Sequence, residues 1–532
     1  MQPAVNVRAE ADPAEGRAAK APKDIKKRFE DLQVSMRRET RRNLLDNRRF
    51  ANPLAATQGD ARCDFSFDHL AQMPNRDMLI AKISEWNAQP THPELLYQFF
   101  EDIASSDVMQ QHAGIIGLRK ILSQKQGLPI QQVIDHNVVV KILAMAQNSA
   151  QPHLQMEATW CLANMASGTT EQTASLIQKN VIPVFVELTR SPFYQIAEQA
   201  IWGLGNISGD CVEFRSAVMK SPAVEVLLEV YDNAASMKVQ DQIVWVFANI
   251  CRLRPDQEPI HATLKRIIAK LIEVFTRSTN AEVQDDALFG ICKSTKATAI
   301  DLFANPDFLA RLYDFEQACL ADLQTHKHRI SAINAILGGL TSSSNVNTLM
   351  VVRSGFLAPF SLLLGCGDES LVRETCWVLS NIAIGEEEQV RALLMEPGLF
   401  PQVVTLTHSA SADLAKEAIW LICNLCLCKN ADNIRFLIDQ GGILDIFKEC
   451  LDVHADSRRI TLVFEALIQL INFFEAGRPA GSENPFVRTL IQTGIAERIE
   501  LLQTHRSEVI YIKALSILET HFALDEDWVP AN

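Results

Sequence analysis

The sequence predicts an all-helical protein built from a repeated unit of about 43 residues. Two segments show the pattern most clearly, 157–168 and 198–210. Each has an acidic residue, then a Trp, then an Asn four residues after the Trp, and then a Gly. Residues four apart lie on one face of a helix, and a Gly soon after them is a usual place for a helix to end. Each copy therefore places an indole and a carboxamide on the same face, near the end of a helix.

The pattern recurs along the chain. The distances from one such Trp to the next are 42, 43, 132 and 43 residues, and 132 is three periods of 44. A helical period in the forties is typical of armadillo and HEAT arrays. We therefore expect a right-handed superhelical solenoid of about ten armadillo repeats over residues 91–522. Five of the seven Trp residues begin a Trp-x-x-x-Asn sequence: Trp160, Trp202, Trp245, Trp377 and Trp420.

Two readings of these Trp–Asn pairs are open, core filling and a binding face. Core filling explains one Trp, but poorly explains five that each have Asn at the same offset. A buried carboxamide needs hydrogen-bond partners, so the pairing favours an exposed, repeated binding face. Two copies between Trp245 and Trp377 are degraded, with Phe289 and Lys293 in one, and Asn334 and Gly338 in the other. We expect residues 280–345 to act as a spacer between two binding regions.

Composition narrows the possible functions. The chain has 48% hydrophobic and 21% charged residues, a net charge of −14 and a pI near 5.4. An acidic body is a poor partner for nucleic acid. No apolar run is long enough to span a bilayer and no signal peptide opens the chain, so we expect no membrane partner. The twelve Cys have no framework spacing and read as reduced core residues of an intracellular protein.

The first 60 residues differ from the rest, because they hold 13 Lys/Arg against 9 Asp/Glu. We expect a disordered tail over 1–22, a basic segment over 23–60 and a linker over 61–90 with one short helix near 78–86. The basic segment reads as a solvated charged helix, a nucleic-acid arm, or a helix that folds against an acidic partner. An acidic tail at 523–532 closes the chain.

Four segments resemble importin-α, the nuclear import adaptor family: EATWCLANMASGTTEQT, EQAIWGLGNISGD, ETCWVLSNIAIGEEEQV and KEAIWLICNLC. The resemblance runs from about residue 25 to the C-terminus. The stretch VSMRRETRRNLLDNRR is similar to that family's importin-β-binding segment. The resemblance implies an adaptor that shuttles between cytoplasm and nucleus. Its partners would be importin-β, cargo with nuclear localisation signals, and an export receptor with Ran-GTP at the C-terminal repeats. Contacts to importin-β would come from Lys26, Lys27, Arg28, Arg37, Arg38, Arg41 and Arg42.

The implied chemistry is recognition of Lys/Arg-rich peptides. Asn side chains would bracket the peptide backbone, Trp rings would hold Lys and Arg stems, and acids would pair with the charged heads. The larger site would use Trp160, Asn164, Ser167, Gln199, Trp202, Asn206, Trp245 and Asn249, and by resemblance the Gly168 carbonyl, Thr173 and Asp210 would hold the most selective Lys. The smaller site would use Glu374, Trp377, Ser380, Asn381, Glu417, Trp420 and Asn424.

Three departures from the family pattern weaken parts of this expectation. The family has Lys-Arg-Arg directly after a Leu-Leu pair, where this chain has Asp46-Asn47-Arg48-Arg49. Self-inhibition through Arg48 and Arg49 is therefore expected to be weak. Asp413 stands where the family has a basic residue, and Gly338 where it has an Asn. Both departures predict weaker selectivity at the smaller site.

The sequence offers no enzyme chemistry. The Cys423-x-x-Cys426-x-Cys428 spacing resembles a metal motif, but it overlaps Asn424 on a repeat helix and lacks a second ligand cluster. No phosphate loop or nucleophile elbow is present, so we expect no metal and no cofactor. The alternative among binding proteins is a general armadillo scaffold, which would lack regular Trp–Asn pairs and would leave the basic N-terminal segment unexplained.

Overall fold

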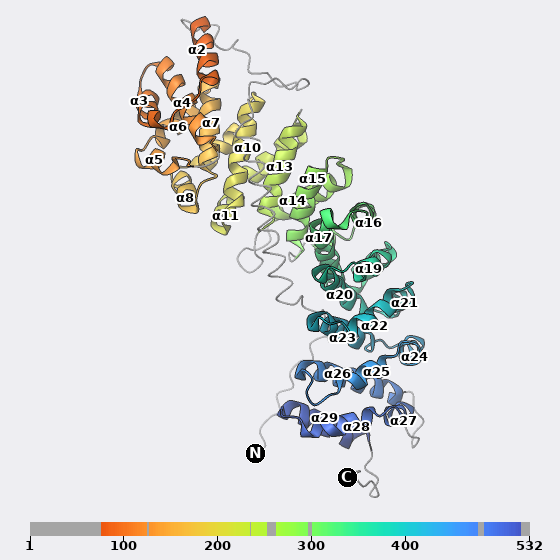
Figure 1. The fold of residues 1–532 in the computed structure, drawn as a ribbon. Coiled ribbons are helices and arrows are strands. Elements are labelled where there is room, and N and C mark those ends of the chain that lie inside the picture. The colour runs from red at the N-terminus through yellow and green to blue at the C-terminus, as the bar shows by residue number, and fades with distance from the viewer. Residues whose placement is uncertain are drawn as a thin grey trace, which may run out of the picture. The chain divides into compact units, whose positions relative to one another are not determined.

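The structure is a computed structural model that describes residues 76–124, 127–234, 236–252, 262–295, 300–476 and 484–522. The basic segment at 23–60 and the two tails, at 1–22 and 523–532, lie outside the described residues. All regular structure in the described ranges is helical. These residues form an N-terminal unit that ends at Leu302 and a C-terminal unit that begins at Phe303 (Figure 1).

The N-terminal unit opens with α2 (Arg76–Ala88) and the short η2 (Pro93–Leu95), and it closes with η3 (Ile300–Leu302). Between them lie five repeats, each ending in one long helix. The final helices α4, α7, α10, α13 and α15 pack against one another in that order, and α2 packs on α4. The repeats are α3 (Leu96–Ala104) and α4 (Val108–Leu122); α5 (Ile130–Asp135), α6 (Val139–Ala146) and α7 (Pro152–Met165); α8 (Thr170–Gln178), α9 (Val181–Leu188) and α10 (Tyr194–Gly209); α11 (Val212–Lys220), α12 (Ala223–Asn233) and α13 (Met237–Ile250); α14 (Ala262–Arg277) and α15 (Ala281–Ser294).

The C-terminal unit also holds five repeats, and its final helices α17, α20, α23, α26 and α29 pack in the same consecutive way. Four of these repeats have three α-helices. The repeats are α16 (Pro306–Leu320) and α17 (Leu323–Thr341); α18 (Asn345–Arg353), α19 (Leu357–Leu364) and α20 (Glu369–Ala383); α21 (Glu387–Met395), α22 (Leu399–Thr407) and α23 (Ala412–Leu425); α24 (Ala431–Asp439), α25 (Ile443–Cys450) and α26 (Ser457–Ala476); α27 (Pro485–Gln492), α28 (Ile495–Leu501), η4 (Leu502–Thr504) and α29 (Glu508–His521).

The turn between the first and second helix of the three-helix repeats has a recurring backbone requirement. Asn180, Gly398, Gly442 and Gly494 directly precede α9, α22, α25 and α28, and all have positive φ values between 62° and 76°. Only Gly, and less often Asn, adopts this left-handed conformation readily. These turns can therefore be recognised in the sequence, because the left-handed conformation requires Gly or Asn at that position.

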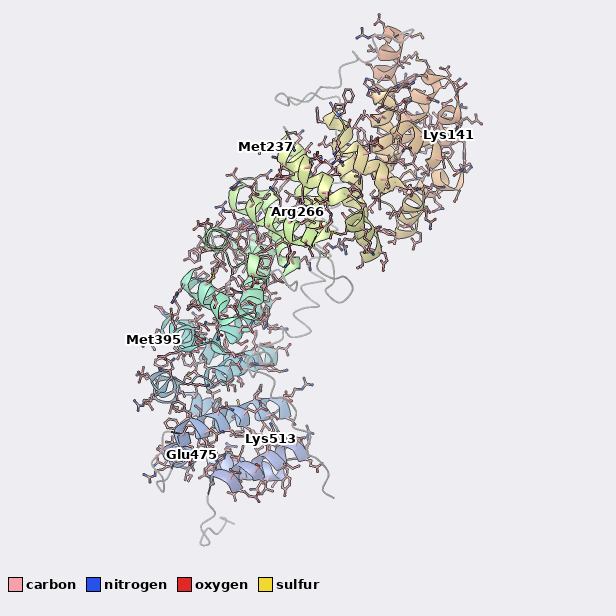
Figure 2. The ribbon with its side chains drawn as sticks, turned by 180° about the vertical axis from the view of Figure 1, so that it is seen from behind. Lys141, Met237, Arg266, Met395, Glu475 and Lys513 are labelled. Carbon is pink, nitrogen blue, oxygen red and sulfur yellow. The ribbon has the colours of Figure 1, made fainter. Side chains whose placement is uncertain are left out.

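Side chains from the stacked helices fill the space between them (Figure 2). Large apolar residues of successive helices are completely buried, among them Phe185, Phe247, Phe360 and Phe464. Each unit is therefore held by contacts between neighbouring repeats, as expected of a solenoid. The predicted all-helical repeat solenoid is confirmed, and the described residues contain ten final helices. The predicted short helix of the linker is also present, as α2.

Candidate functional site

The Trp–Asn pairs occupy equivalent places in five final helices: α7, α10 and α13 in the N-terminal unit, and α20 and α23 in the C-terminal unit. Each Trp is the ninth residue of its helix and each Asn is the thirteenth. Because these helices pack side by side within each unit, the pairs form two rows. We call them the N-terminal ladder (Trp160/Asn164, Trp202/Asn206, Trp245/Asn249) and the C-terminal ladder (Trp377/Asn381, Trp420/Asn424).

The ladder carboxamides connect each repeat to the one before it. The Nδ2 of Asn206 donates a hydrogen bond to the carbonyl of Ala163 at 3.0 Å, and that of Asn249 donates to Gly205 at 3.3 Å. In the C-terminal ladder, Asn424 donates to the carbonyl of Ser380 at 3.2 Å. Two further ladder residues donate to hydroxyl or carbonyl oxygens of the preceding repeat: Asn164 to Ser123 Oγ (3.2 Å), and Asn381 to Gly338 O (3.4 Å) and Thr341 Oγ1 (3.3 Å).

These contacts correct the expectation that the carboxamides are exposed, and the rings of Trp160 and Trp202 are buried as well, at 2% and 3% exposure. Asn164, Asn206 and Asn381 are each 4% exposed or less, because carbonyl and hydroxyl groups of the preceding helix satisfy the amide nitrogen. The Oδ1 atoms of the same three residues are buried and have no hydrogen-bond partner in the described part of the chain. In each of these three carboxamides, the Nδ2 is therefore hydrogen-bonded within the protein, while the Oδ1 can still accept a hydrogen bond.

The rings of Trp245 and Trp377 pack directly on the backbone of the preceding final helix. A Cβ atom added to Gly205 would lie 1.9 Å from Cζ3 of Trp245, and one added to Gly338 would lie 2.0 Å from Cζ3 of Trp377. Both positions thus exclude any side chain. Gly338 therefore corresponds to Gly205, the residue before a ladder Asn: the carbonyls of both accept from the next ladder Asn, and both lie under the next indole.

An arginine of the first repeat covers the start of the N-terminal ladder. The Arg119 guanidinium lies 4.6 Å from the centre of the Trp160 ring. Its Nε donates to Glu157 Oε2 at 2.7 Å, and its Nη2 donates to Asn87 Oδ1 of α2. Arg119 and Glu157 are both buried, as is the Trp160 ring. The acid that precedes Trp160 by three residues is therefore already neutralised by the protein itself.

The neighbouring Lys120 anchors α2. Its Nζ donates to the carbonyls of Trp86 and Asn87 at 2.8 and 3.1 Å, and also to that of Gln89. These carbonyls lie at or just beyond the C-terminal end of α2, where a cation is favoured by the helix dipole. Burial lowers the pKa of Lys120 below its ordinary value, and the charge of Arg119 lowers it further.

The residues predicted to hold the most selective Lys lie together where α7 leads into α8. Thr173 is fully buried and its Oγ1 donates to the carbonyl of Ala166 at 3.4 Å. Asp210, which follows α10, accepts a hydrogen bond from Thr170 Oγ1 at 2.9 Å, a contact that the sequence did not suggest. Gly168 is half-buried beside them, and Ser167 Oγ donates to the carbonyl of Asn164 at 2.7 Å. Gln199 of α10 has a buried Oε1 without a hydrogen-bond partner in the described residues.

The acids of the C-terminal ladder differ from Glu157. Glu374 is 6% exposed, accepts a hydrogen bond from Ser331 Oγ at 2.9 Å through Oε1, and has a buried Oε2 without a hydrogen-bond partner among the described residues. Burial raises the pKa of Glu374 to about 7. Burial also raises the pKa of Glu417, which stands three residues before Trp420. Ser380 Oγ donates to the carbonyl of Trp377 at 2.9 Å. Asp413, expected to weaken this site, lies 3.7 Å from Arg373 of the preceding repeat, measured from Oδ2 to Nη1.

The degraded copies keep the geometry of the repeat but change its chemistry. Phe289 is the ninth residue of α15, and the Lys293 ammonium lies 5.9 Å from the centre of its ring. In α17, Asn334 is fully buried and its Nδ2 donates to Thr375 Oγ1 at 3.4 Å. The first copy thus carries a cation where the ladders carry a carboxamide. The second has a buried Asn whose Oδ1, like those of Asn164, Asn206 and Asn381, has no hydrogen-bond partner in the described residues.

Comparisons with known proteins agree with this architecture. The Armadillo/beta-catenin-like repeat model matches residues 128–167, 169–209 and 344–384, and the Atypical Arm repeat model matches residues 484–532. Importin subunit alpha-5 of Arabidopsis thaliana is 30% identical to the chain over 413 residues, which are 77% of each protein. The chain belongs to the importin subunit alpha family.

Other family members align over still more of the chain. Importin subunit alpha-1a of Oryza sativa subsp. japonica is 28% identical over 515 residues, 93% of this chain and 94% of the relative. Importin subunit alpha-1b of the same organism is 28% identical over 430 residues, 80% and 78% of the two chains. The crystal structure of an engineered protein from the Northeast Structural Genomics Consortium shares the fold, with a TM-score of 0.63 at 20% identity over 80% of this chain and 98% of that one.

Membership in the importin subunit alpha family supports a general role as an adaptor in nuclear import. Armadillo arrays of this family are transport adaptors rather than enzymes. The Cys423-x-x-Cys426-x-Cys428 motif fits this assignment, since all three residues are buried in the repeat and burial raises the pKa of the Cys423 thiol well above its ordinary value. No group of three or more His, Cys, Asp or Glu residues in the described ranges is arranged to hold a metal ion.

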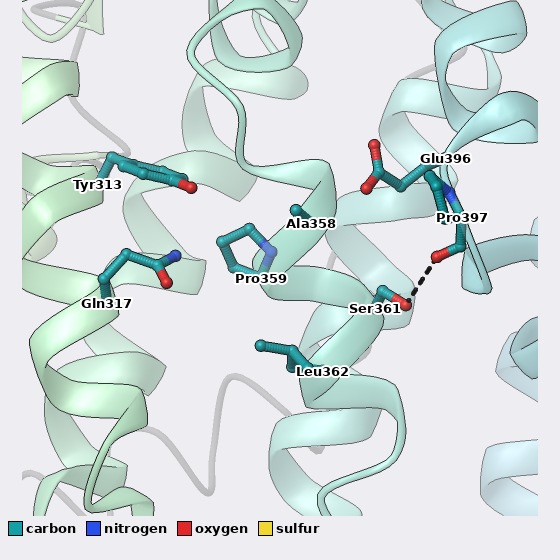
Figure 3. A pocket seen from close by; sticks show the side chains of 8 residues that line it. All are labelled: Tyr313, Gln317, Ala358, Pro359, Ser361, Leu362, Glu396 and Pro397. Atoms are coloured by element: carbon teal, nitrogen blue, oxygen red, sulfur yellow. Dashed lines mark hydrogen bonds between the residues drawn. The ribbon is translucent and has the colours of Figure 1, made fainter.

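Two further features of the C-terminal unit lie away from the ladders. A pocket of about 260 Å³ is lined by Tyr313, Gln317, Ala358, Pro359, Ser361, Leu362, Glu396 and Pro397 (Figure 3). Ser361 Oγ donates to the carbonyl of Pro397 across one side of it, at 3.4 Å. In the described part of the chain, no single helix is long and apolar enough to cross a membrane, and only the bent pair α18 and α19 reaches that length and composition together.

Proposed function

We propose that the two ladders bind Lys/Arg-rich nuclear localisation signals in extended conformation. The observation that carries the proposal is the set of buried, unpartnered Oδ1 atoms at Asn164, Asn206 and Asn381. A buried acceptor without a donor costs free energy. The backbone N–H groups of a bound peptide are donors of the required kind, and they are present whatever the peptide sequence.

The repeat spacing suits an extended peptide. Packed helices lie ~8–10 Å apart, and an extended chain rises ~3.3 Å per residue. One carboxamide per repeat therefore faces about every third peptide residue. The fold fixes each carboxamide through its Nδ2, so the acceptor is already oriented before the peptide arrives, and little conformational entropy is lost on binding.

The Trp rings and the acids give the preference for basic side chains. A Lys or Arg stem gains apolar burial and a cation–π attraction beside an indole. In the C-terminal ladder, the unpartnered Oε2 of Glu374 is a ready acceptor for an ammonium or guanidinium group. In the N-terminal ladder, Asp210, Thr173 and the Gly168 carbonyl would hold one Lys.

The basic segment completes the proposed adaptor. Lys26, Lys27, Arg28, Arg37, Arg38, Arg41 and Arg42 would bind importin-β, and Arg48 and Arg49 would occupy the ladders only weakly because Asp46 and Asn47 replace basic residues. The last repeats, up to α29, would bind an export receptor with Ran-GTP. Shuttling between cytoplasm and nucleus follows from these partners. All residues of the basic segment lie outside the described ranges, so this part depends on the sequence.

Fluorescence anisotropy with a labelled Lys/Arg-rich peptide tests the ladder. Trp202→Ala should weaken binding by at least tenfold, because it removes the middle ring of the N-terminal ladder. Trp86→Ala, in α2 and outside both ladders, is the matched control and should leave binding unchanged. If Trp202→Ala and Asp210→Ala both bind like the unaltered chain, the ladder is not the peptide site. A general armadillo scaffold would then be the better explanation.

Self-inhibition is tested by the same titration on residues 61–532. Equal affinity for the full chain and the truncated chain would support weak inhibition by the basic segment. Tighter binding by the truncated chain would show that Arg48 and Arg49 inhibit despite Asp46 and Asn47.

A further inference from the structure

The turns that follow α7 and α10 are built on the same plan. In each, the residue thirteen positions after the ladder Trp donates a hydrogen bond to the carbonyl six positions after that Trp. In the first turn, Thr173 Oγ1 donates to the carbonyl of Ala166 at 3.4 Å. In the second turn, Arg215 Nε donates to the carbonyl of Ser208 at 3.0 Å. The two turns can therefore be compared position by position.

Two arginines hold the second turn against the turn that follows α13. Arg252 stands seven residues after the ladder Trp of α13, and its Nη1 donates to the carbonyl of Gly209 at 2.6 Å. Arg215 donates in the opposite direction, from Nη1 to the carbonyl of Arg252 at 3.4 Å, and is itself only 2% exposed. The carbonyls of Ser208, Gly209 and Arg252 are thus all hydrogen-bonded to guanidinium groups of the chain.

The turn after α7 meets a different neighbour. Gly209 stands in its repeat where Arg252 stands in the next one, so it has no side chain that could reach back to this turn. The residue after Gly209 is Asp210, whose Oδ1 accepts a hydrogen bond from Thr170 Oγ1 at 2.9 Å. In the next repeat, Leu253 stands at the position of Asp210. The turn after α7 therefore faces a carboxylate of the following repeat, whereas the turn after α10 faces a guanidinium group.

We propose that Arg252 restricts the N-terminal ladder to a single Lys site, because its guanidinium fills the corresponding place one repeat later. The single Lys site is the proposed one at the Gly168 carbonyl, Thr173 and Asp210, so the inference rests on the proposed function and specifies it further. A peptide ammonium group gains affinity only from acceptors that face it. At the turn after α10, the carbonyls already accept from arginines and Leu253 replaces the acid. The exclusion requires no net positive charge at this turn, because it follows from acceptors that the chain already uses.

A single Lys site also fixes the register of the peptide. The ladder carboxamides offer the same acceptor in each repeat, so contacts to the peptide backbone alone would allow a shift by one repeat. Such a shift corresponds to about three peptide residues, given helices ~8–10 Å apart and a rise of ~3.3 Å per residue. A Lys-selective place in only one repeat removes this ambiguity.

The test is an alanine scan of a labelled seven-residue Lys/Arg-rich peptide, titrated by anisotropy against the full chain. The unaltered chain should show one sensitive position, where Ala lowers the affinity roughly tenfold. Arg252→Ala/Leu253→Asp frees the turn after α10 and supplies an acid. This variant should show a second sensitive position, with a loss of roughly fivefold, about three residues from the first. Leu253→Asp alone keeps Arg252 in place and is the matched control, which should show one sensitive position.

Gly209→Arg tests the same inference in the opposite direction. A Cβ atom at Gly209 would lie 3.4 Å from Nδ2 of Asn249, which is an ordinary contact, so this position can carry a side chain. The new guanidinium would reach back to the turn after α7 as Arg252 reaches back to Gly209. Ala at the sensitive peptide position should then cost less than about twofold, whereas the control Gly209→Ala should keep the roughly tenfold loss. Thermal denaturation of each variant checks that the fold is retained, and Gly209→Arg decides the question if the double variant is unfolded.

The outcomes separate two failures. The inference is contradicted if Leu253→Asp alone creates a second sensitive position, if the folded double variant creates none, or if Gly209→Arg keeps the first. In each of these cases the proposed function stands, because the peptide still binds the unaltered chain. If no peptide of the series binds the unaltered chain, the proposed function itself fails.

Discussion

Glu157 and Glu374 occupy the same place in two repeats, three residues before a ladder Trp, yet their surroundings are opposite. Glu157 is paired at 2.7 Å with Arg119 of the preceding repeat. Among the described residues, Glu374 accepts one hydrogen bond, from the Ser331 hydroxyl, and burial raises its pKa to about 7. The motif around each Trp is the same in both units. The neighbouring helix therefore decides whether an acid is already paired or still able to bind a cation.

The residue responsible for the difference can be located. Arg119 precedes Trp160 by 41 residues, and the residue 41 positions before Trp377 is Ile336, which is fully buried. The arginine reaches across to Glu157, whereas the isoleucine packs into the core and offers Glu374 no charged group. We infer that Arg119 already pairs with the acid at the first position of the N-terminal ladder. In the C-terminal ladder, Glu374 can still pair with a cation of the ligand.

Removing one partner of the buried pair should have the largest effect. Arg119→Ala leaves Glu157 buried without a cation, which is expected to cost ~3–5 kcal/mol in the free energy of unfolding of the N-terminal unit. Hydrogen exchange of α4 and α7 measures this loss regionally. Arg266→Ala, which breaks an exposed pair, is the control and should cost ~1 kcal/mol or less. Equal effects of the two changes would mean that burial does not distinguish these pairs.

A side chain at position 338 should be destabilising. Gly338→Asn would place a side chain where the Trp377 ring packs, so it should destabilise α17 and α20 by ~1–3 kcal/mol and should not strengthen peptide binding. Chemical denaturation followed by tryptophan fluorescence measures the loss. A stable variant with tighter binding would show that Trp377 moves easily, and would contradict the packing argument.

Binding at the C-terminal ladder should depend on pH near neutrality. The raised pKa of Glu374 means that the free protein holds the proton below about pH 7, whereas a bound cation favours the ionised carboxylate. Affinity should therefore rise as pH increases from 6 to 8, by roughly five- to tenfold. The assay uses Trp202→Ala, so that the C-terminal ladder dominates. Glu374→Gln should bind more weakly and show a flat profile over this range.

The smallest effect concerns a second unpaired acid of the C-terminal unit. Glu316 of α16 is fully buried, neither carboxylate oxygen has a hydrogen-bond partner among the described residues, and burial raises its pKa to about 8. The folded chain holds this proton between about pH 4.5 and 8 while the unfolded chain does not, so stability falls as pH rises through that window. Glu316→Gln should raise the melting temperature by a few degrees at pH 8 and leave it unchanged at pH 4.5. An equal gain at both pH values would rule out titration of Glu316 as the cause.

The sequence predicted the ladder itself well, because the Trp–Asn spacing is local and recurs at a fixed period. It placed all five pairs on helices, and the turns with Asn180 or Gly442 were also readable from residue type. Arg119 was missed because it belongs to no Trp–Asn copy and reaches Trp160 only through packing. The burial of Asn206 was missed for a similar reason, since its partner is a backbone carbonyl 43 residues earlier.

Backbone recognition by the ladder carboxamides is the central claim, and a backbone-modified peptide tests it most directly. The measurement compares a Lys/Arg-rich peptide with the same peptide N-methylated at every third residue, in each of the three possible phases, by anisotropy against the full chain. N-methylation removes N–H donors and leaves the side chains unchanged. The account predicts that one phase loses at least tenfold in affinity, and that Asn206→Ala reduces this loss. Equal affinity of all three modified peptides and the unmodified one would contradict the account, since the ladder Oδ1 atoms would then not hold the peptide backbone.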